Sequence, residues 1–256
     1  MTDFAHRKSV VFIRSLIFQI AFYLNLTLHV LVSVPAFILP QKIMIEIARS
    51  WGRTSIWLLS AICGVHLELR GKEKIPKGPL LVASKHQSAW DTFALLPMFP
   101  YPTYVLKREL TWIPFFGWCL LKTGQIPLDR SAGKESMATL IARVRKALGQ
   151  GRQVIVFPEG TRRPVYAEPD YKLGIVQLYA GAQVPCLPMA LNSGQFWPRR
   201  RFLRPPGTIV VEYLDVIPPG LPRAAFFRRL QNDIETATNR LLADEEARRS
   251  PRQRPN

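Results

Sequence analysis

An uncharged segment of 25 residues, Ser15 to Leu39, constrains the fold of this chain more than any other feature of its sequence. As a single helix rising ~1.5 Å per residue it would be roughly 37 Å long, which exceeds the ~30 Å hydrocarbon core of a bilayer. Pro35 is expected to kink this helix near its end, and Pro40 to break the chain. The segment is also too long for the apolar core of a signal peptide. It therefore predicts that the first part of the chain associates with a membrane.

A second apolar stretch, Thr54 to Val65, has 12 uncharged residues and is too short to span a bilayer. Together the two stretches predict a membrane-associated helical hairpin over residues 1–64. Three basic residues flank each side of the long segment, so the distribution of positive charge gives no orientation; these are Arg7, Lys8, Arg14, Lys42, Arg49 and Arg53. The hairpin either spans the bilayer or lies within one leaflet. A hairpin of buried core helices in a soluble protein is the alternative.

Beyond Val65 the pattern changes to short β-rich runs that alternate with helical ones. This alternation predicts one α/β domain over residues 65–242, with a β-sheet flanked by helices. The expected helices run from Lys134 to Leu148, from Gly174 to Tyr179 and from Arg223 to Leu241, and a basic disordered tail is expected over 243–256. The expected strands are 65–70, 80–84, 104–107, 125–128, 153–157, 184–191 and 209–214.

The charge of the chain predicts an anionic partner. Lys plus Arg number 35 against 18 Asp plus Glu, a net charge of +17, which suits nucleic acid, an anionic bilayer or a phosphorylated substrate. Cys63, Cys119 and Cys186 are scattered, and no HExxH, P-loop, GxGxxG or GxSxG pattern occurs. The sequence thus indicates neither a metal site nor a bound nucleotide cofactor.

One candidate site is the pair His86 and Asp91, which follows the apolar strand Leu80–Ser84. Five residues on a regular helix would place the two side chains roughly 140° apart. If His86 lies instead in the strand-to-helix turn, the Asp91 carboxylate can reach its Nδ1, fix the tautomer and leave Nε2 free as a base. A surface histidine beside a helix-capping aspartate is the alternative.

A second candidate site is the turn Phe157-Pro-Glu-Gly-Thr-Arg162, which ends a buried strand. Gly160 permits a turn with positive φ, Arg162 can hold a phosphate through a bidentate fork, and the Gly160 and Thr161 amides can add donors. Glu159 is expected to orient Arg162 or to hold a substrate hydroxyl. The alternative is a strand-ending turn with a solvated arginine.

Taken together, four blocks over residues 65–215 resemble the glycerolipid acyltransferases in order and spacing. They are His86 with Asp91, Gly124–Arg130, Phe157–Arg162 and Val184–Pro188, with a similar connecting segment over 107–118. The chain looks most like the bacterial members that acylate 1-acyl-sn-glycerol 3-phosphate, also called lysophosphatidic acid. Two positions depart from the pattern: Lys85 stands where an Asn often precedes the histidine, and Pro127 stands where a β-former is usual.

The resemblance implies a mixed β-sheet flanked by helices and an O-acyltransferase that makes phosphatidic acid for phospholipid synthesis. It implies that His86 is the base and Asp91 its partner. It further implies that Arg130 and the turn Glu159, Gly160, Thr161 and Arg162 bind the glycerol phosphate. Lys107 is a candidate oxyanion donor. Another acceptor, namely glycerol 3-phosphate, a different lysophospholipid or a lyso-aminolipid, stays open. So does a non-catalytic basic module that binds membrane or nucleic acid.

The expected partners are lysophosphatidic acid, an acyl thioester and anionic membrane lipid, without nucleic acid. No bound cofactor is expected, and the thioester is carried as co-substrate by coenzyme A or by acyl carrier protein. The expected location is the cell inner membrane with the catalytic domain on the cytoplasmic side. The motifs do not distinguish the two donors, and they fix neither the acyl-chain length nor the oligomeric state.

Overall fold

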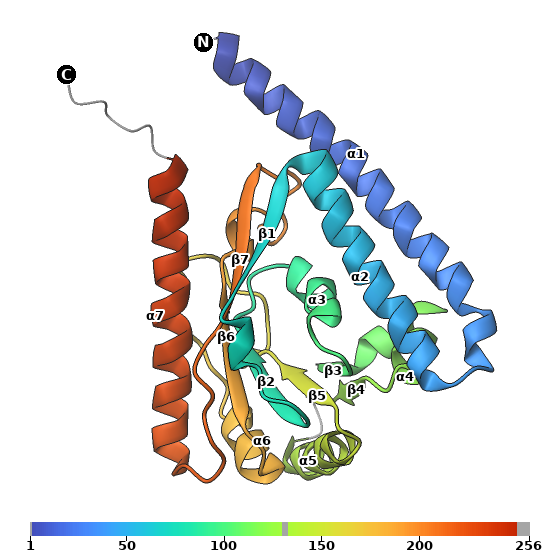
Figure 1. Cartoon of the computed structure of the whole chain (residues 1–256), viewed down its shortest axis with the longest axis vertical. Coiled ribbons are helices and arrows are strands. Elements are labelled where there is room, and N and C mark those ends of the chain that lie inside the picture. Colours follow the sequence, from blue (N-terminus) through green and yellow to red (C-terminus); the bar gives the residue numbers. More distant parts are fainter. Residues whose placement is uncertain (1, 130–132, 250–256) are drawn as a thin grey trace.

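The computed structural model describes residues 2–129 and 133–249 of the chain. One seven-stranded sheet lies at its centre, in the order β1-β7-β6-β2-β5-β3-β4 (Figure 1). Only the β6–β7 pairing is antiparallel, so the sheet is mixed, as expected. The strands are β1 (Val65–Arg70), β2 (Leu80–Ser84), β3 (Pro102–Lys107), β4 (Ile126–Leu128), β5 (Gln153–Val156), β6 (Cys186–Leu191) and β7 (Gly207–Tyr213).

Each of the seven predicted strands is present, and no end differs from the prediction by more than two residues. The central strands β2, β5 and β6 are buried along their whole length. Their near-continuous apolar sequences, such as Leu80-Leu-Val-Ala83, are typical of parallel strands that are covered on both faces.

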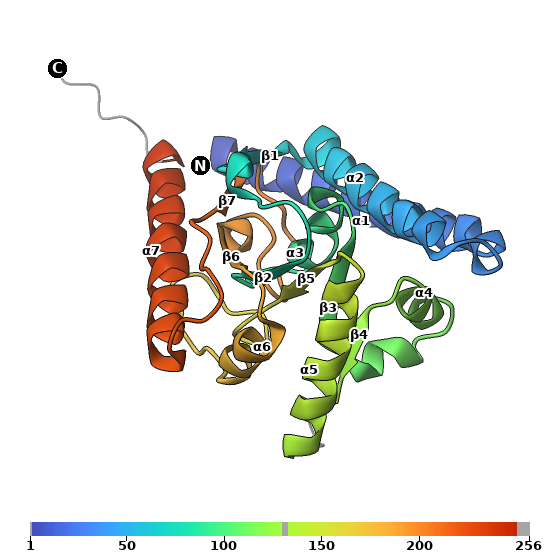
Figure 2. The ribbon, with the colours of Figure 1, turned by 60° about the horizontal axis from the view of Figure 1, so that its bottom comes forward.

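Helices cover both faces of the sheet (Figures 1 and 2). On one face lie α1, α2 and α3, and they contribute Phe18, Leu59 and Trp90 to the core. On the other face lie α5, α6 and α7, which contribute Val144, Tyr179 and Phe226. Their bounds are α1 (Thr2–Ser33), α2 (Gln41–Cys63), α3 (Trp90–Ala94), α4 (Phe116–Lys122), α5 (Gly133–Gly149), α6 (Gly174–Ala182) and α7 (Arg223–Arg249); short 3-10 turns are η1 (Pro35–Phe37), η2 (Lys72–Lys74), η3 (Leu96–Met98), η4 (Arg108–Trp112) and η5 (Ser193–Gln195).

The predicted hairpin is formed by α1 and α2, which lie side by side (Figure 1). Asn25, a polar residue within the apolar segment, faces the partner helix: its amide donates to the Thr54 and Ser55 hydroxyls at 3.0 Å each. Residues Lys8–Ser33 are long and apolar enough to cross a membrane by length and composition, and only 11% of their most apolar window is buried. Most of the apolar surface of α1 therefore faces away from the protein.

A buried arginine ties this hairpin to the sheet. Arg152 is 2% exposed, and its guanidinium donates to the Thr103 hydroxyl at 2.8 Å and to the Thr123 carbonyl at 3.0 Å. It also donates to the side-chain oxygen of Gln41, the first residue of α2. The short helix α4 lies beneath the hairpin turn in Figure 2, and the Gln41 amide donates to the Lys122 carbonyl at its end at 2.9 Å.

One expectation about the end of the chain was wrong. Residues 243–249, predicted to begin a disordered tail, continue α7, because Glu245 is buried and pairs with Arg249 at 3.0 Å. Residues 250–256 lie outside the described residues. The proposed division into 1–64, 65–242 and a tail otherwise stays a prediction.

Candidate active site

The pairing of β2 with its neighbours assembles the site. Strands β2 and β5 are adjacent and parallel, and so are β2 and β6. Loops that follow adjacent parallel strands meet at one edge of the sheet, the usual place for a site in an α/β fold. His86 follows β2, the turn 157–162 follows β5, and Ser193 follows β6. The structure thus brings together motifs that are about seventy residues apart in sequence.

The Asp91 carboxylate is the most heavily bonded group at this edge. It is fully buried. Its Oδ2 accepts from His86 Nδ1 at 2.9 Å and from the Gln87 and Ser88 amides at 2.8 and 2.9 Å. Its Oδ1 accepts from the Ser193 hydroxyl at 2.6 Å. All these partners act as donors, which is the arrangement that a buried ionised carboxylate needs.

This bonding assigns the His86 tautomer. Because the Asp91 carboxylate only accepts, His86 Nδ1 carries the hydrogen, and Nε2 of the neutral ring is left with its lone pair. The imidazole stacks on the Phe157 ring, with centroids 3.9 Å apart and planes 15° apart. Packing and hydrogen bonding therefore fix the ring, and a fixed ring with a free Nε2 is suited to act as a general base.

The turn after β5 is built differently from the expectation in two respects. Gly160 has φ +66, as its positive-φ role requires, but its amide donates to the Phe157 carbonyl at 2.9 Å within the turn. Glu159 is 1% exposed, and its carboxylate bonds Lys85 Nζ at 2.9 Å and the His86 amide at 3.4 Å. The pKa of Glu159 is raised above its ordinary value, because the effect of burial is larger than the opposing effect of the Lys85 ammonium. Within the described part of the chain, Arg162 is therefore not a partner of Glu159.

The other predicted substrate-binding residues have different surroundings. The Arg162 guanidinium makes no hydrogen bond or ion pair within the described part of the chain, and its backbone carbonyl accepts from Arg199 at 3.1 Å. Thr161 is exposed. Lys107 pairs with Glu109 at 2.9 Å. Arg130 lies outside the described residues.

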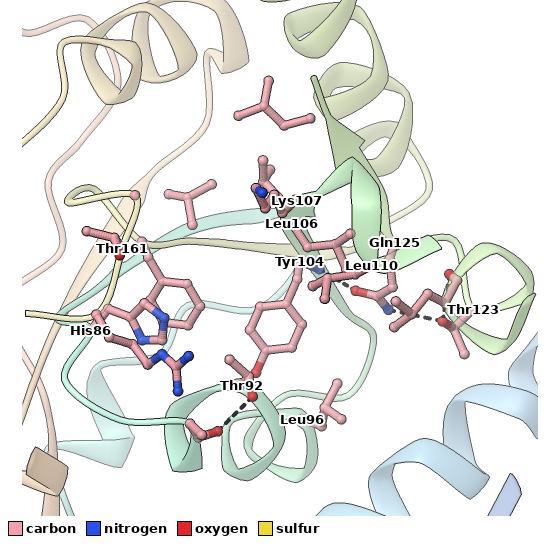
Figure 3. Close-up of a pocket in the computed structure, with 18 of the residues that line it drawn as sticks. His86, Thr92, Leu96, Tyr104, Leu106, Lys107, Leu110, Thr123, Gln125 and Thr161 are labelled. Atoms are coloured by element: carbon pink, nitrogen blue, oxygen red, sulfur yellow. Dashed lines mark hydrogen bonds between the residues drawn. The ribbon is translucent and has the colours of Figure 1, made fainter. Parts of the chain in front are cut away.

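A cavity of ≈ 1030 Å³ extends from His86 toward the hairpin (Figure 3). Its polar end has His86, Thr161, Arg162 and Lys107, and Figure 3 shows the His86 and Tyr104 side chains facing the same space. Its side toward the hairpin is mainly apolar, and the apolar lining from α1, α2 and α4 includes Leu26, Val30, Met44, Ile47, Trp51 and Leu120. An apolar cavity with a few polar groups at one end is suited to an amphiphilic ligand.

Several residues that touch the candidate site were not predicted from the sequence. Ser193 has no motif signal, because it reaches Asp91 only through the β2–β6 pairing. The buried Tyr104 hydroxyl donates to the Asp91 carbonyl at 3.2 Å. Lys85 was noted only as a departure from the family pattern. Among the residues whose side chains the structure describes, no group of three or more His, Cys, Asp or Glu could hold a metal ion.

Comparison with known proteins identifies the kind of domain. The family model described as Acyltransferase matches residues 66–192. A 1-acyl-sn-glycerol-3-phosphate acyltransferase from Pseudomonas aeruginosa is 42% identical over 165 residues, which is 64% of each chain. Proteins of the same name from Saccharomyces cerevisiae and, as the alpha form, from Homo sapiens are 30% and 32% identical over 53% and 52% of this chain. The matched segments span 64%, 46% and 47% of these relatives' own lengths.

A solved structure has the same fold. The crystal structure of the 1-acyl-sn-glycerophosphate acyltransferase PlsC from Thermotoga maritima has a TM-score of 0.76 to this chain and 22% sequence identity, and it covers 92% of this chain and 97% of that one. Both the resemblance read from the four blocks and the predicted architecture, a mixed sheet flanked by helices behind a helical hairpin, are confirmed.

Ser193→Ala tests the support of Asp91. The change removes the donor to a fully buried carboxylate oxygen, so the free energy of unfolding should fall by roughly 1–3 kcal/mol, measured by denaturant titration. Thr92→Ala is the control, since its exposed hydroxyl bonds only the Ala89 carbonyl three residues back, and it should change stability by less than about 0.5 kcal/mol. Equal stability of the two variants would contradict this role for Ser193.

Proposed function

We propose that this chain is an acyltransferase that moves a fatty acyl group from an acyl thioester to the sn-2 hydroxyl of 1-acyl-sn-glycerol 3-phosphate, and the match of the Acyltransferase family model to residues 66–192 supports the reaction class. The product is phosphatidic acid. One observation carries the proposal: the His86–Asp91 pair stands at a cavity that is lined mainly by apolar side chains and has charged and polar groups near the imidazole. The names of the bacterial, yeast and human relatives support the choice of acceptor.

The proposed reaction needs no acyl-enzyme, because the acceptor hydroxyl is itself the nucleophile. His86 Nε2 removes the hydroxyl proton as the oxygen attacks the thioester carbonyl carbon. The tetrahedral intermediate collapses, the carbon–sulfur bond breaks and the thiol leaves with the proton that His86 had taken. Asp91 stabilises the imidazolium that forms between these steps, and its buried hydrogen bonds keep the ring in place.

We assign the acceptor phosphate to the turn after β5. Arg162 lines the cavity, and its guanidinium has no ion pair with any of the described residues, so its fork is available to an anion. Thr161 lies beside it and adds a hydroxyl. Arg130 keeps its proposed share of this role. Binding the phosphate away from the reacting atoms would align the sn-2 hydroxyl with His86.

We assign the acyl chains to the apolar part of the cavity, whose lining comes largely from the hairpin and α4. This placement gives the hairpin a part in the reaction as well as in membrane binding. Lysophosphatidic acid and phosphatidic acid both reside in a bilayer, so the cavity and the exposed apolar face of α1 would draw on the same lipid.

We further propose that the protein works at the cell inner membrane with its catalytic region on the cytoplasmic side. The exposed apolar side chains on α1 support membrane binding; they include Phe12, Leu16, Ile20, Leu24, Leu28 and Leu31. In the sequence, Arg199–Arg201 and Arg204 form a basic cluster beside Trp197, a composition suited to anionic headgroups. Trp197 and Arg204 are in fact buried against each other, 4.3 Å apart, so only the exposed arginines of the cluster remain for this role.

His86→Ala tests the base. Removing Nε2 should lower kcat for thioester-dependent acylation of lysophosphatidic acid by about 10²–10⁴-fold, with a smaller change in KM. The assay uses membranes containing the full chain at matched expression. His66→Ala is the control, because His66 is exposed and bonds only Ser60 among the described residues. Equal activity of His86→Ala and wild type would remove His86 from the chemistry.

Arg162→Gln tests phosphate recognition. Loss of a charged pair should raise KM for lysophosphatidic acid by about 10–100-fold, which corresponds to roughly 1.5–3 kcal/mol. Activity toward a monoacylglycerol, which has no phosphate, should be no lower in Arg162→Gln than in wild type. Arg228→Gln changes an exposed arginine on α7, away from the turn, and should behave like wild type. A protein that prefers the phosphate-free acceptor from the start would contradict both this role and the proposed substrate.

Leu24→Glu/Leu31→Glu tests the membrane surface. These side chains are 66% and 62% exposed on α1, and a carboxylate at apolar depth costs roughly 2.5–3.5 kcal/mol. The double variant should lose most of its sedimentation with neutral phosphatidylcholine vesicles. Asn232→Glu/Asn239→Glu places the same charges on exposed positions of α7, across the sheet from the hairpin (Figure 1), and should sediment as wild type does. Unchanged binding of the α1 variant would exclude this face.

A further inference from the structure

A buried ion-pair network lies directly beside the proposed base, and the proposed mechanism does not use it. Lys85 precedes His86 and is 3% exposed. Its Nζ donates to Glu159 Oε1 at 2.9 Å and to Glu235 Oε1 at 2.7 Å. The Tyr171 hydroxyl donates to the same Glu235 oxygen at 2.9 Å. A charge so far out of water persists only with such partners, and removing one of them is costly.

The network continues into the backbone of the base. The second oxygen of Glu159, Oε2, accepts from the His86 amide at 3.4 Å. From the same turn, the Arg163 amide donates to the His86 carbonyl at 2.8 Å. The turn after β5 therefore contacts both sides of the His86 backbone. The position of His86 relative to Arg162 depends on how firmly Glu159 is held.

Glu235, which bonds Lys85, lies outside the segment that the family model matches. Glu235 lies on α7, which begins at Arg223, whereas the match ends at residue 192. The neighbouring Ile234 is fully buried, and the Tyr171 ring packs edge-on against Phe227 of the same helix. The C-terminal helix is thus anchored where its carboxylate meets Lys85.

We propose that Lys85 and Glu235 are positioning residues that hold Glu159 against the His86 backbone, so that α7 sets the alignment between the base and the phosphate-binding turn. The inference rests on the proposed function for its kinetic consequence. The groups that face Glu159 are the Lys85 ammonium, the Glu235 carboxylate behind it and the His86 amide; Tyr171 reaches it through Glu235. Lys85 is the cation between two carboxylates, and among the described residues no other cation pairs with Glu159.

The test compares Lys85→Met with Lys85→Met/Glu159→Gln in the full chain. Lys85→Met leaves the Glu159 charge buried without its cation, and kcat/KM for lysophosphatidic acid should fall by about 10–100-fold, as for a misplaced catalytic group. Adding Glu159→Gln should restore at least part of this loss, because a neutral amide oxygen still accepts from the His86 amide. Unchanged kinetics in Lys85→Met, or no recovery in the double variant, would overturn the proposal.

Two substitutions of Glu235 with different severity test the contribution of α7. Glu235→Gln keeps an oxygen that accepts from Lys85 and Tyr171, whereas Glu235→Leu removes it, so the leucine variant should lose several-fold more kcat/KM than the glutamine variant. Asp244→Asn removes a charge from an exposed position on the same helix and should have wild-type kinetics. Equal activity of Glu235→Leu and wild type would exclude α7 from positioning.

A stability measurement separates this inference from the proposed function. In Lys85→Met the cation that lowers the pKa of Glu159 is gone, so burial should raise this pKa further above its ordinary value of 4.5, and the unpaired buried charge forms as pH rises through the folded pKa. Stability is then present at low pH and is lost as pH rises through the folded pKa. The melting temperature should decline over this range relative to wild type, and Glu159→Gln should remove the decline. A wild type inactive on lysophosphatidic acid that shows this pattern would refute the substrate and keep the network. An active wild type without the pattern would refute the network alone.

Discussion

The burial of one carboxylate organises the candidate site. Asp91 is held without contact to water by two amides, an imidazole and a hydroxyl. An unpaired charge in such a place would cost several kcal/mol, so the donors have to stay where they are. They come from the loops after β2 and β6, which only the parallel register of the sheet brings together. The same bonds fix the His86 tautomer, so the requirement to satisfy a buried charge also prepares a base.

The cavity relates this polar edge to the membrane-directed part of the chain. One end reaches the imidazole and the arginine of the turn, and the other end is lined by the hairpin and α4. Arg152 fastens the hairpin to the sheet through Gln41, so the apolar wall has a fixed position relative to His86. An amphiphile in this cavity would place its headgroup at the charged end and its chain against α1 and α2. The geometry suits a lipid acceptor whose reacting hydroxyl lies close to its phosphate.

Local patterns predicted the elements well, because each strand and helix has its own hydrophobic period. Leu80–Ser84 and Lys134–Leu148 are examples with ends nearly as expected. The His86–Asp91 contact was also predictable, since the turn that joins them is short. The contacts of Ser193, Glu235 and Lys85 were not, because they depend on strand order and on the docking of α7, which no local spacing encodes. The contact of Glu159 with Lys85 was not predictable for the same reason, since the two residues are 74 positions apart.

In the proposed complex, the free nitrogen of His86 faces the acceptor hydroxyl while Arg162 holds the phosphate of the same molecule. A crystal structure with bound lysophosphatidic acid and no acyl donor measures both contacts at once. We expect His86 Nε2 to lie within about 2.6–3.2 Å of the sn-2 oxygen. We also expect Arg162 to be in hydrogen-bond contact with the phosphate and the acyl chain to lie in the apolar part of the cavity. A phosphate bound away from the 157–162 turn, or a hydroxyl out of reach of His86, would contradict this arrangement.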